Sequence, residues 1–471
     1  MGIYFSRRGA LSAMAGFLAV SLTGSLLSQA GFAGGESETL RREEVQAALN
    51  STMLQNVFYD DLGNPLCETV AEAGIAAALY DPEAYSWVIG RARAGDERTW
   101  GVRAWLADHD WNTIEVPGDR APIVFLTIDP NLQKAATQIV QSWPSNERSC
   151  LVAMDADTGA VLAYANHPAS SLPVNANDGA PKEFVVQAEA DDPAYFLPVP
   201  YDRILCGSTM KIIDTAAILS SGIDTLYTDT GEAHGVHNYG QAVYGDVTLE
   251  KACAESLNTY FVSKIVDSLG YQPWADTAQA FGIQPEAEGM EAASAIQLEF
   301  GGDALLGTYA YQSVESQGDL INASIGQGPV GVSPLSICRW AGAIVNTSGG
   351  LYEPYLLDHL ETSSGEILLQ KSSPEPVSLP LGNAELQSRM QQVFSGVAAS
   401  YSLRAPGAEL IVAKTGTAQI NDSLNHILLT VGVKANGRNI CFCLCRERVS
   451  LTSSALLPSA QQFLDAIAAN C

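Results

Sequence analysis

Short apolar runs of strand-like length occur near both ends of the region that follows residue 118. Neighbouring runs are joined by residues of turn composition, Asp157-Thr158-Gly159 and Ala435-Asn436-Gly437, which favour hairpins. The pattern therefore predicts one antiparallel sheet assembled from both ends of this region, with a long helical middle inserted between them. The runs are residues 122–128, 151–155, 160–165, 410–413, 426–434 and 440–446.

Helices are predicted beside these runs. Asp129 and the proline that follows it supply an N-cap and a first-turn proline for a helix that ends near Gln141. Residues 212–219 have helical composition and are closed by Gly222, and residues 454–468 have helical composition as well. Strands and helices in this order indicate an α+β fold.

The amino-terminal segment has the composition of an export signal. Arg7 and Arg8 precede residues 9–35, which contain no charged residue and are long enough to cross about 30 Å of hydrocarbon. This charge distribution favours a cytoplasmic amino terminus, with everything after the segment outside. We interpret residues 1–35 as a signal anchor. A signal peptide cleaved near the small residues at its end competes with that interpretation, and a twin-arginine signal is a third.

The next region, residues 36–118, is predicted to be small and largely helical, with one turn at residues 60–65. Pro117-Gly118-Asp119 is a turn cluster, and we place the start of the following domain, residues 119–471, there. Residues 170–202 contain prolines and acidic residues without a clear period, which predicts a surface excursion.

Composition and charge exclude two classes of protein. Apolar residues make up 47% of the 471 residues and charged residues 16%, so the chain is able to fill a core and is not a disordered acidic polymer. The 25 Lys and Arg residues against 52 Asp and Glu residues give a formal net charge of −27. A chain this acidic is a poor candidate for binding nucleic acid.

Neither the cysteines nor the histidines predict a metal site. Nine cysteines are too few for a disulfide scaffold. Cys441, Cys443 and Cys445 alternate with apolar residues at the period of a strand, so their side chains share one face, and we interpret them as buried thiols. His234 and His237 lie in a loop that contains glycine and are interpreted as surface or hydrogen-bonded residues. No metal ion or other cofactor is predicted.

A candidate nucleophile and its base stand at the start of the helix predicted for residues 212–219. Ser208 and Lys211 are separated by three positions, so their side chains face the same way. A serine hydroxyl is a poor nucleophile until a base takes its proton, and a desolvated lysine in a positive field is neutral enough to do so. Alone the pattern is unspecific, because Ser-x-x-Lys occurs in many chains and serine often only caps a helix.

Two further motifs strengthen the interpretation of Ser208 and Lys211 as catalytic residues. Ser256-Leu257-Asn258 lies between two helical stretches, where a helix cap and a buried amide are the commoner explanation. Lys414-Thr415-Gly416-Thr417 continues the strand predicted for residues 410–413, and Gly416 allows a ligand or another backbone to approach closely. In this order, the three motifs match the serine–lysine set of penicillin-interacting enzymes.

From about Pro122 to its end the chain resembles the transpeptidase domain of penicillin-binding proteins, which share a superfamily with β-lactamases. The resemblance implies a five-stranded antiparallel sheet flanked by helices, with a large helical insertion. The small amino-terminal helical region, residues 36–118, is interpreted as a stalk or pedestal that precedes this domain. Residues 58–66 resemble the opening segment of class B members, and Cys206 departs from the proline that the family usually has there. Further segments in family order are residues 126–129, 132–133, 158–163, 324–328 and 333–334.

The resemblance also implies an activity, that of a peptidoglycan D,D-transpeptidase inhibited by β-lactams. Ser208 would attack a donor peptide ending in D-Ala-D-Ala while Lys211 takes the serine proton, and an amine acceptor would resolve the acyl-enzyme. Ser256 would relay a proton to the leaving D-Ala, Asn258 would hold the substrate amide, and Lys414 would help to bind the terminal carboxylate. The remaining expected contacts are the backbone of Ser208 and Thr417 around the oxyanion, and Thr415, Gly416 and Thr417 around the substrate.

Other readings remain open from the sequence. Water in place of the amine would give a D,D-carboxypeptidase or a β-lactamase. A catalytically silent scaffold or β-lactam sensor is the alternative from another class, although the intact Ser208, Lys211 and Lys414 argue against it. The expected partners are stem peptides, β-lactams, the membrane through residues 1–35, and a glycosyltransferase.

Overall fold

The computed structural model describes residues 123–167, 204–286, 310–362, 365–370 and 374–470, together with short pieces at 58–59, 65–70, 76–79, 84–85, 88, 102, 300–301 and 303–304. The predicted anchor at residues 1–35 and the predicted excursion at residues 170–202 lie outside the described residues. Among the helices that are described, none is both long and apolar enough to span a bilayer.

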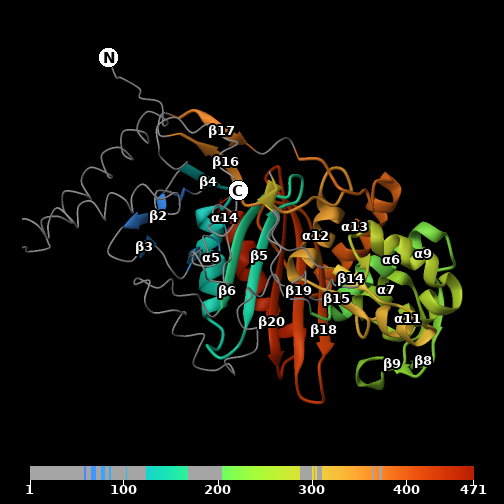
Figure 1. The fold of residues 1–471 in the computed structure, drawn as a ribbon. Coiled ribbons are helices and arrows are strands. Elements are labelled where there is room, and N and C mark those ends of the chain that lie inside the picture. The colour runs from blue at the N-terminus through green and yellow to red at the C-terminus, as the bar shows by residue number, and fades with distance from the viewer. Residues whose placement is uncertain are drawn as a thin grey trace, which may run out of the picture.

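A five-stranded antiparallel sheet forms the centre of the fold (Figure 1), in the strand order β18-β19-β20-β5-β6. The sheet therefore joins two early strands to three late ones, which confirms the prediction from both ends of the domain. In the β5–β6 turn, Asp155 Oδ1 accepts hydrogen bonds from the backbone N–H of Asp157 and the Thr158 hydroxyl. The strands are β5 (Ser149–Asp155), β6 (Val161–His167), β18 (Ala408–Gln419), β19 (Asn425–Ala435) and β20 (Arg438–Val449).

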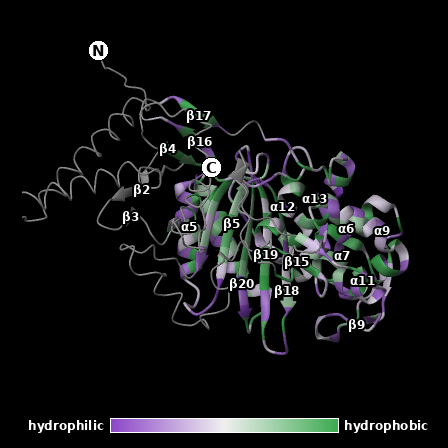
Figure 2. Cartoon of the chain, viewed as in Figure 1, coloured by the Kyte–Doolittle hydropathy of each residue, from purple (hydrophilic) through white to green (hydrophobic). Residues whose placement is uncertain are grey.

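Each face of this sheet has its own core, because its strands are apolar on both sides (Figure 2). On one face the thiols of Cys441, Cys443 and Cys445 pack toward α12 (Pro334–Val345), which confirms that they are buried and share a face. On the other face Phe442 packs edge-on against Phe463 of α14 (Leu457–Asn470), with ring centroids 4.9 Å apart. The seven cysteines that are described are free thiols.

Helices cover both faces and also form a separate region beside the β18 edge (Figure 1). The helix predicted after Asp129 is α5, whose first turn is capped by the Asp129 carboxylate through the N–H groups of Asn131 and Leu132. The helices are α5 (Pro130–Gln141), α6 (Lys211–Ser221), α7 (Leu249–Ala254), α8 (Asn258–Ser263), α9 (Tyr271–Ala280), α11 (Gln317–Ala323), α12 (Pro334–Val345), α13 (Ala384–Ser400) and α14 (Leu457–Asn470). Shorter turns are the 3-10 helices η5 (Gly207–Met210), η6 (Tyr239–Gln241) and η8 (Ser453–Leu456), and the π-helix η7 (Lys264–Leu269).

A second sheet was not predicted. It has six strands in the order β17-β16-β4-β1-β2-β3, and the run predicted at residues 122–128 is its strand β4, not part of the central sheet. Because β1, β2 and β3 lie within residues 36–118, the prediction that this region is largely helical is wrong for the residues of these strands. Strand β4 joins a group of strands far before it to a pair far after it in the sequence, so no local pattern reveals its partners. The strands are β1 (Phe58–Tyr59), β2 (Pro65–Val70), β3 (Ala76–Leu79), β4 (Ile123–Leu126), β16 (Leu357–Glu361) and β17 (Ile367–Gln370).

The remaining strands are short and lie in small sheets of two or three. They are β7 (Tyr227–Asp229), β8 (Glu232–Ala233), β9 (Val236–His237), β10 (Gly245–Val247), β11 (Gln284–Pro285), β12 (Phe300–Gly301), β13 (Asp303–Ala304), β14 (Ala310–Gln312) and β15 (Val330–Val332).

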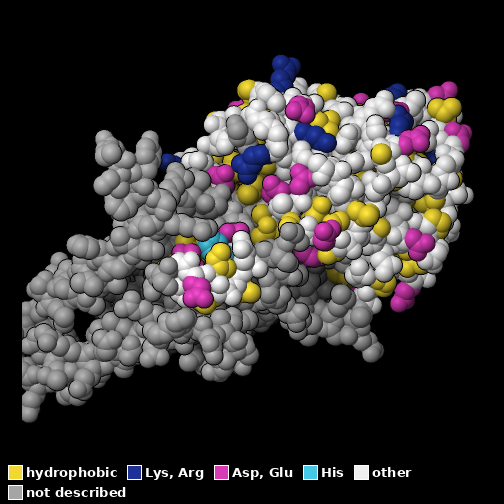
Figure 3. Space-filling view, turned by 90° about the horizontal axis from the view of Figure 1, so that it is seen from above, with side chains coloured by type: hydrophobic (Ala, Val, Ile, Leu, Met, Phe, Trp, Pro, Cys, Tyr) yellow, Lys and Arg dark blue, Asp and Glu magenta, His cyan; other side chains and the backbone are white. Residues whose placement is uncertain are grey.

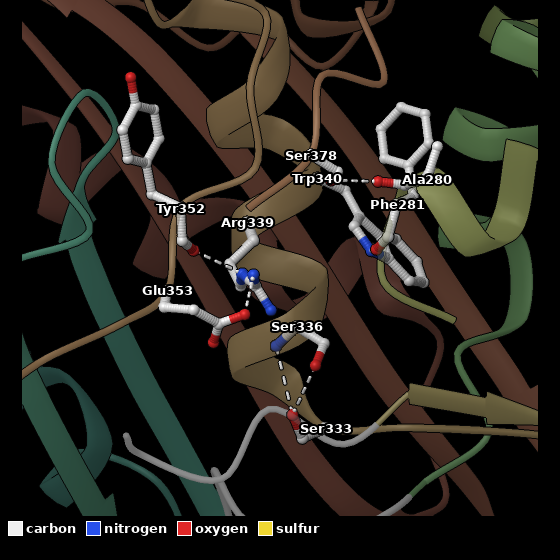
Figure 4. Close-up of polar contacts among 9 residues, drawn as sticks. All are labelled: Ala280, Phe281, Ser333, Ser336, Arg339, Trp340, Tyr352, Glu353 and Ser378. Atoms are coloured by element: carbon white, nitrogen blue, oxygen red, sulfur yellow. Dashed lines mark hydrogen bonds and ion pairs between the residues drawn. The ribbon is translucent and has the colours of Figure 1, made fainter. Parts of the chain in front are cut away.

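Helix α12 connects the sheet to the helical region (Figure 4). Ser333 caps its first turn by accepting a hydrogen bond from the N–H of Ser336. Arg339 donates to the Tyr352 carbonyl and to Glu353, while Trp340 Nε1 donates to the Phe281 carbonyl at the end of α9. The buried Trp340–Phe281 hydrogen bond therefore joins α12, which packs on the sheet, to the end of α9 in the helical region.

The described surface shows no concentration of positive charge on the face drawn in Figure 3, where Lys and Arg side chains are scattered among Asp and Glu. This agrees with the overall charge of −27 and with the exclusion of a nucleic-acid-binding surface.

Candidate active site

Ser208 lies in the 3-10 turn η5, directly before helix α6. The N–H of Gly207 donates to the Gly326 carbonyl at 2.9 Å, so the segment predicted at residues 324–328 supports the turn that carries the serine. Gly326 has φ +69, and a Cβ atom there would overlap the backbone of Gly207. Only glycine allows this close approach.

Strand β18 packs against the same turn through Gly416. A Cβ atom on Gly416 would lie 2.5 Å from the carbonyl oxygen of Cys206. The prediction that Gly416 allows a close approach is therefore confirmed for the backbone that precedes Ser208. This packing brings the backbone of Ser208 close to that of residues 416–418, since a Cβ on Gly207 would lie 2.7 Å from the Thr417 carbonyl oxygen.

Lys211 is the most connected polar side chain of the site, although it is fully buried. Its Nζ atom lies 3.0 Å from Ser208 Oγ, 2.8 Å from Asn258 Oδ1, and 2.6 Å and 3.1 Å from the carbonyl and hydroxyl oxygens of Ser256. The fold therefore brings the first two sequence motifs into direct contact.

Electrostatics favour the neutral amine of Lys211. Burial is the largest cause that lowers its pKa well below 10.5, and the positive charge of Lys414 lowers it further, whereas the nearby Asp214 carboxyl acts in the opposite direction. A neutral amine has two hydrogens and one lone pair. The two shortest contacts, to Ser256 O and Asn258 Oδ1, take the hydrogens. The lone pair is then free to accept the Ser208 proton.

Ser256 lies between the two lysines. Its φ of +56 is uncommon for a non-glycine residue and places both its carbonyl and its hydroxyl toward Lys211. Lys414, also fully buried, donates to Ser256 Oγ at 3.0 Å and to the Thr415 carbonyl at 3.1 Å. The third motif is thus linked to the second through one hydroxyl.

Asn258 is oriented by its own second contact. Its Nδ2 donates to the His237 carbonyl at 3.2 Å, which leaves Oδ1 facing Lys211. The side chain of His237 contacts the Gly231 carbonyl, and that of His234 contacts Asp267 at 2.7 Å. Their interpretation as hydrogen-bonded residues is confirmed.

Thr415 and Thr417 alternate with Lys414 and Gly416 along the strand, so their side chains leave from its other side. The Thr415 hydroxyl lies 2.8 Å from that of Tyr401, at the end of α13, and the Thr417 hydroxyl donates to Ser453 Oγ at 3.0 Å. Sequence reasoning missed Tyr401 and Ser453, because no motif marks either one and only the fold places them at the strand.

Cys206 has no part in this network of side chains. Burial raises the pKa of its thiol to about 12, so it stays protonated. It is the carbonyl of Cys206, not its sulfur, that meets Gly416.

A five-stranded sheet with a Ser-Lys pair at the start of its adjoining helix, a Ser-x-Asn turn and a Lys-Thr-Gly strand defines the penicillin-interacting class of proteins. A family model described as penicillin binding protein transpeptidase domain matches residues 149–467. The chain belongs to that family.

Curated relatives include two proteins named peptidoglycan D,D-transpeptidase PbpA. The one from Mycolicibacterium smegmatis is 31% identical over 290 residues, which are 56% of this chain and 53% of the relative. The one from Mycobacterium tuberculosis is 29% identical over 343 residues, 64% of this chain and 61% of the relative. The matches thus span about half to three fifths of the relatives' length.

Solved structures share the fold. The D,D-transpeptidase domain of a peptidoglycan glycosyltransferase from Eggerthella lenta superposes with a TM-score of 0.69 at 22% identity, over 88% of this chain and 98% of the other. Penicillin-binding protein A from M. tuberculosis gives 0.68 at 22% identity, over 88% and 99%. A structure of the latter as a penicillin G acyl-enzyme complex gives 0.65 at 22% identity, over the same shares.

Proposed function

We propose that this protein is a peptidoglycan D,D-transpeptidase that forms an acyl-enzyme on Ser208. The observation that carries the proposal is the 3.0 Å contact between Ser208 Oγ and the buried amine of Lys211. Relatives named peptidoglycan D,D-transpeptidases support the same activity.

In the first half-reaction, Lys211 takes the Ser208 proton while Oγ attacks the carbonyl carbon of the penultimate D-Ala. The backbone N–H groups of Ser208 and Thr417 stabilise the resulting oxyanion. Collapse of the tetrahedral intermediate breaks the bond to the terminal D-Ala, whose nitrogen receives the proton through the hydroxyl of Ser256. That hydroxyl lies 3.1 Å from Lys211 Nζ, within reach for a relay.

In the second half-reaction, the amine of a neighbouring stem peptide attacks the ester. Lys211 takes the proton of that amine and returns a proton to Ser208 Oγ as the ester bond breaks, so a new amide crosslink forms and the enzyme is regenerated. No cofactor takes part in either half.

The donor's terminal carboxylate requires a positive charge and hydroxyl donors. Lys414 supplies the charge beside Ser256, and Thr415, Gly416 and Thr417 supply strand and hydroxyl contacts. Asn258 holds the substrate amide. These assignments extend the same proposal, and they suit an acidic chain in which few lysines exist.

We propose in addition that the protein is held in the cell membrane with its catalytic domain outside. Residues 1–35 anchor the protein in the membrane, residues 36–118 form a short stalk, and residues 119–471 work on the outer side, next to a partner glycosyltransferase that supplies glycan strands. The uncharged segment at residues 9–35 supports the anchor. Protease accessibility in intact cells, with membrane fractionation, tests it; a cytosolic, protease-protected catalytic domain would refute this part.

Intact-mass measurement of the full chain after exposure to penicillin G tests the activity. A stable adduct in the wild type that is absent from Ser208→Ala is the expected result, and no adduct in the wild type would overturn the proposal, in favour of a silent scaffold. Rapid loss of the adduct with antibiotic hydrolysis would indicate a β-lactamase. With a donor peptide, release of D-Ala without transfer to an added amine would indicate a carboxypeptidase.

A further inference from the structure

A buried carboxylate lies behind the Ser-x-Asn turn, at the end of strand β7. Asp229 is 2% exposed and accepts four hydrogen bonds. Its Oδ1 atom accepts from Gly231 N at 3.0 Å and Thr259 Oγ1 at 2.8 Å. Its Oδ2 atom accepts from Asn238 Nδ2 at 3.0 Å and Tyr244 N at 2.9 Å. Both oxygens are fully used inside the protein.

The groups bound by Asp229 belong to two segments that must meet at the catalytic turn. Asn238 follows His237, and Thr259 follows Asn258. The Asn238 amide oxygen accepts from the N–H of Thr259 at 3.2 Å, and it also lies 3.0 Å from the Thr259 hydroxyl, whose single proton goes to Asp229. The residues that precede Asn238 and Thr259 are also hydrogen-bonded to each other, since Asn258 Nδ2 donates to the His237 carbonyl at 3.2 Å. Residues 237–238 are thus joined to residues 258–259 twice.

This pairing sets the direction of the catalytic amide. A carbonyl oxygen has no proton, so His237 can only face the NH₂ group of Asn258, and Oδ1 must then point to Lys211 at 2.8 Å. Helix α8 begins at Asn258 with no side-chain cap from its own N-cap residue, and Asn238 satisfies the free N–H of Thr259 instead.

Asp229 is suited to hold this arrangement because it is charged. Burial raises the pKa of its carboxyl, but the hydrogen bonds from Gly231, Thr259, Tyr244 and Asn238 lower it by more, and the net shift is downward. A carboxylate accepts from all four donors at once. An amide in its place would present an NH₂ group, which cannot accept a hydrogen bond, to two of these donors.

We propose that Asp229 is a positioning residue for acylation, which holds Asn238 and Thr259 and through them keeps the Asn258 amide oxygen on Lys211. The inference rests on the proposed function, since the orientation of Asn258 matters to the rate only if Lys211 is the base. A residue that merely stabilised the β7–β10 hairpin would affect folding and leave the rate of the folded enzyme unchanged.

A double-mutant cycle tests the inference on the full chain. The second-order rate constant of acylation by a fluorescent penicillin is measured for the wild type, Asp229→Asn, Asn258→Ala and the double variant. Asp229→Asn should lower the rate constant by a factor on the order of 10², the cost of a misplacement of about 1 Å. In the Asn258→Ala background the same change should cost less than about twofold, because the positioned group is gone.

Asp246→Asn is the matched control, because Asp246 lies in the paired strand β10 and its carboxylate accepts only an exposed bond from Thr228. Its rate constant should equal that of the wild type. The inference would be overturned if the rate losses of the two single variants simply multiplied in the double variant, or if Asp229→Asn kept the wild-type rate. A wild type that is not acylated at all would instead contradict the proposed function.

If the thermal unfolding midpoint of Asp229→Asn shows that this variant does not fold, a second pair of variants tests the same inference. Thr259→Ser keeps the hydroxyl that contacts Asp229 and Asn238 and should retain the rate constant to within about threefold. Thr259→Val removes that hydroxyl at nearly constant volume and should lower the rate in the same Asn258-dependent manner. Equal rates in the two threonine variants would overturn the inference as well.

Discussion

Replacing Gly416 by alanine separates the geometry of the site from the stability of the fold. Gly416 lies in strand β18 with a backbone conformation that other residues can adopt, so alanine introduces no backbone strain. In the folded state its effect is steric, because the new Cβ atom would lie 2.5 Å from the Cys206 carbonyl oxygen and 3.0 Å from Thr209 Cγ2. Both neighbours flank Ser208, so relief of the clash must move the nucleophile.

The size of that movement follows from the contact distance. Ordinary van der Waals contact for a Cβ atom begins at 3.4 Å, so the oxygen must retreat from 2.5 Å by about 0.9 Å. A displacement of about 1 Å at a reacting group costs on the order of 10²-fold in rate. Overpacking of this kind costs about 1–3 kcal/mol of stability, partly offset by about 0.4–1 kcal/mol from the lower entropy of the unfolded alanine chain.

The assay is the acylation rate constant with a fluorescent penicillin, measured beside the free energy of unfolding in urea. We expect the rate to fall on the order of 10²-fold in Gly416→Ala while the protein stays folded. Gly396→Ala is the control, since Gly396 lies in helix α13 with nothing within 4 Å of a Cβ atom, and alanine should only stabilise that helix by about 1 kcal/mol. An acylation rate within about threefold of the wild type in a folded Gly416→Ala protein would refute the reasoning.

Three further predictions test charges and hydroxyls around the site. Since burial and a neighbouring charge lower the pKa of Lys211 well below 10.5, the acylation rate should fall as the pH drops through that lowered pKa and reach its plateau well below pH 10.5; a rate still rising at pH 10 would contradict this. Burial raises the pKa of Asp214 well above 3.8, despite the hydrogen bond from Trp274 and the charge of Lys211. The folded state therefore retains a proton that the unfolded state releases, so the unfolding free energy should lose a contribution as the pH rises above about 3.8. Asp214→Asn should lack that decline in urea unfolding at pH 4 and pH 7, and identical pH dependences would contradict the assignment. Tyr401→Phe removes the 2.8 Å contact with Thr415 and should weaken penicillin binding before acylation by about 0.5–1.5 kcal/mol, with the maximal acylation rate nearly unchanged; the opposite split between binding and rate would rule out this role.

Local sequence accounts for much of the fold. The N-cap of α5 at Asp129, the β5–β6 turn after Asp155 and the closure of α6 by Gly222 each depend on residues within one turn of one another, and all were predicted. The alternation of Cys441 and its neighbours likewise predicted their common face. Periodicity and capping express short-range forces, which a sequence displays directly.

Contacts between distant segments were not predictable in the same way. Strand β4 pairs with β1 and β16, which are remote from it in the sequence, so the sheet that contains it could not be predicted from a local pattern. Tyr401, at the end of α13, and Ser453, in η8, contact the Lys-Thr-Gly strand only because the fold packs these helices beside it. Asp229 looks like any acidic loop residue until the fold surrounds it with four donors.

The sequence by itself determined which residue types the chemistry has available, because the spacing of Ser208 and Lys211 on one helix start already places them together. What makes the two residues reactive comes from their surroundings in the folded protein. Burial and the approach of Lys414 lower the pKa of Lys211, and the Ser256 and Asn258 oxygens occupy its hydrogens. Desolvation and the proximity of a second charge arise only when segments remote in sequence are packed together. The lowered pKa of Lys211, and with it the reactivity of this lysine, therefore depends on the tertiary structure.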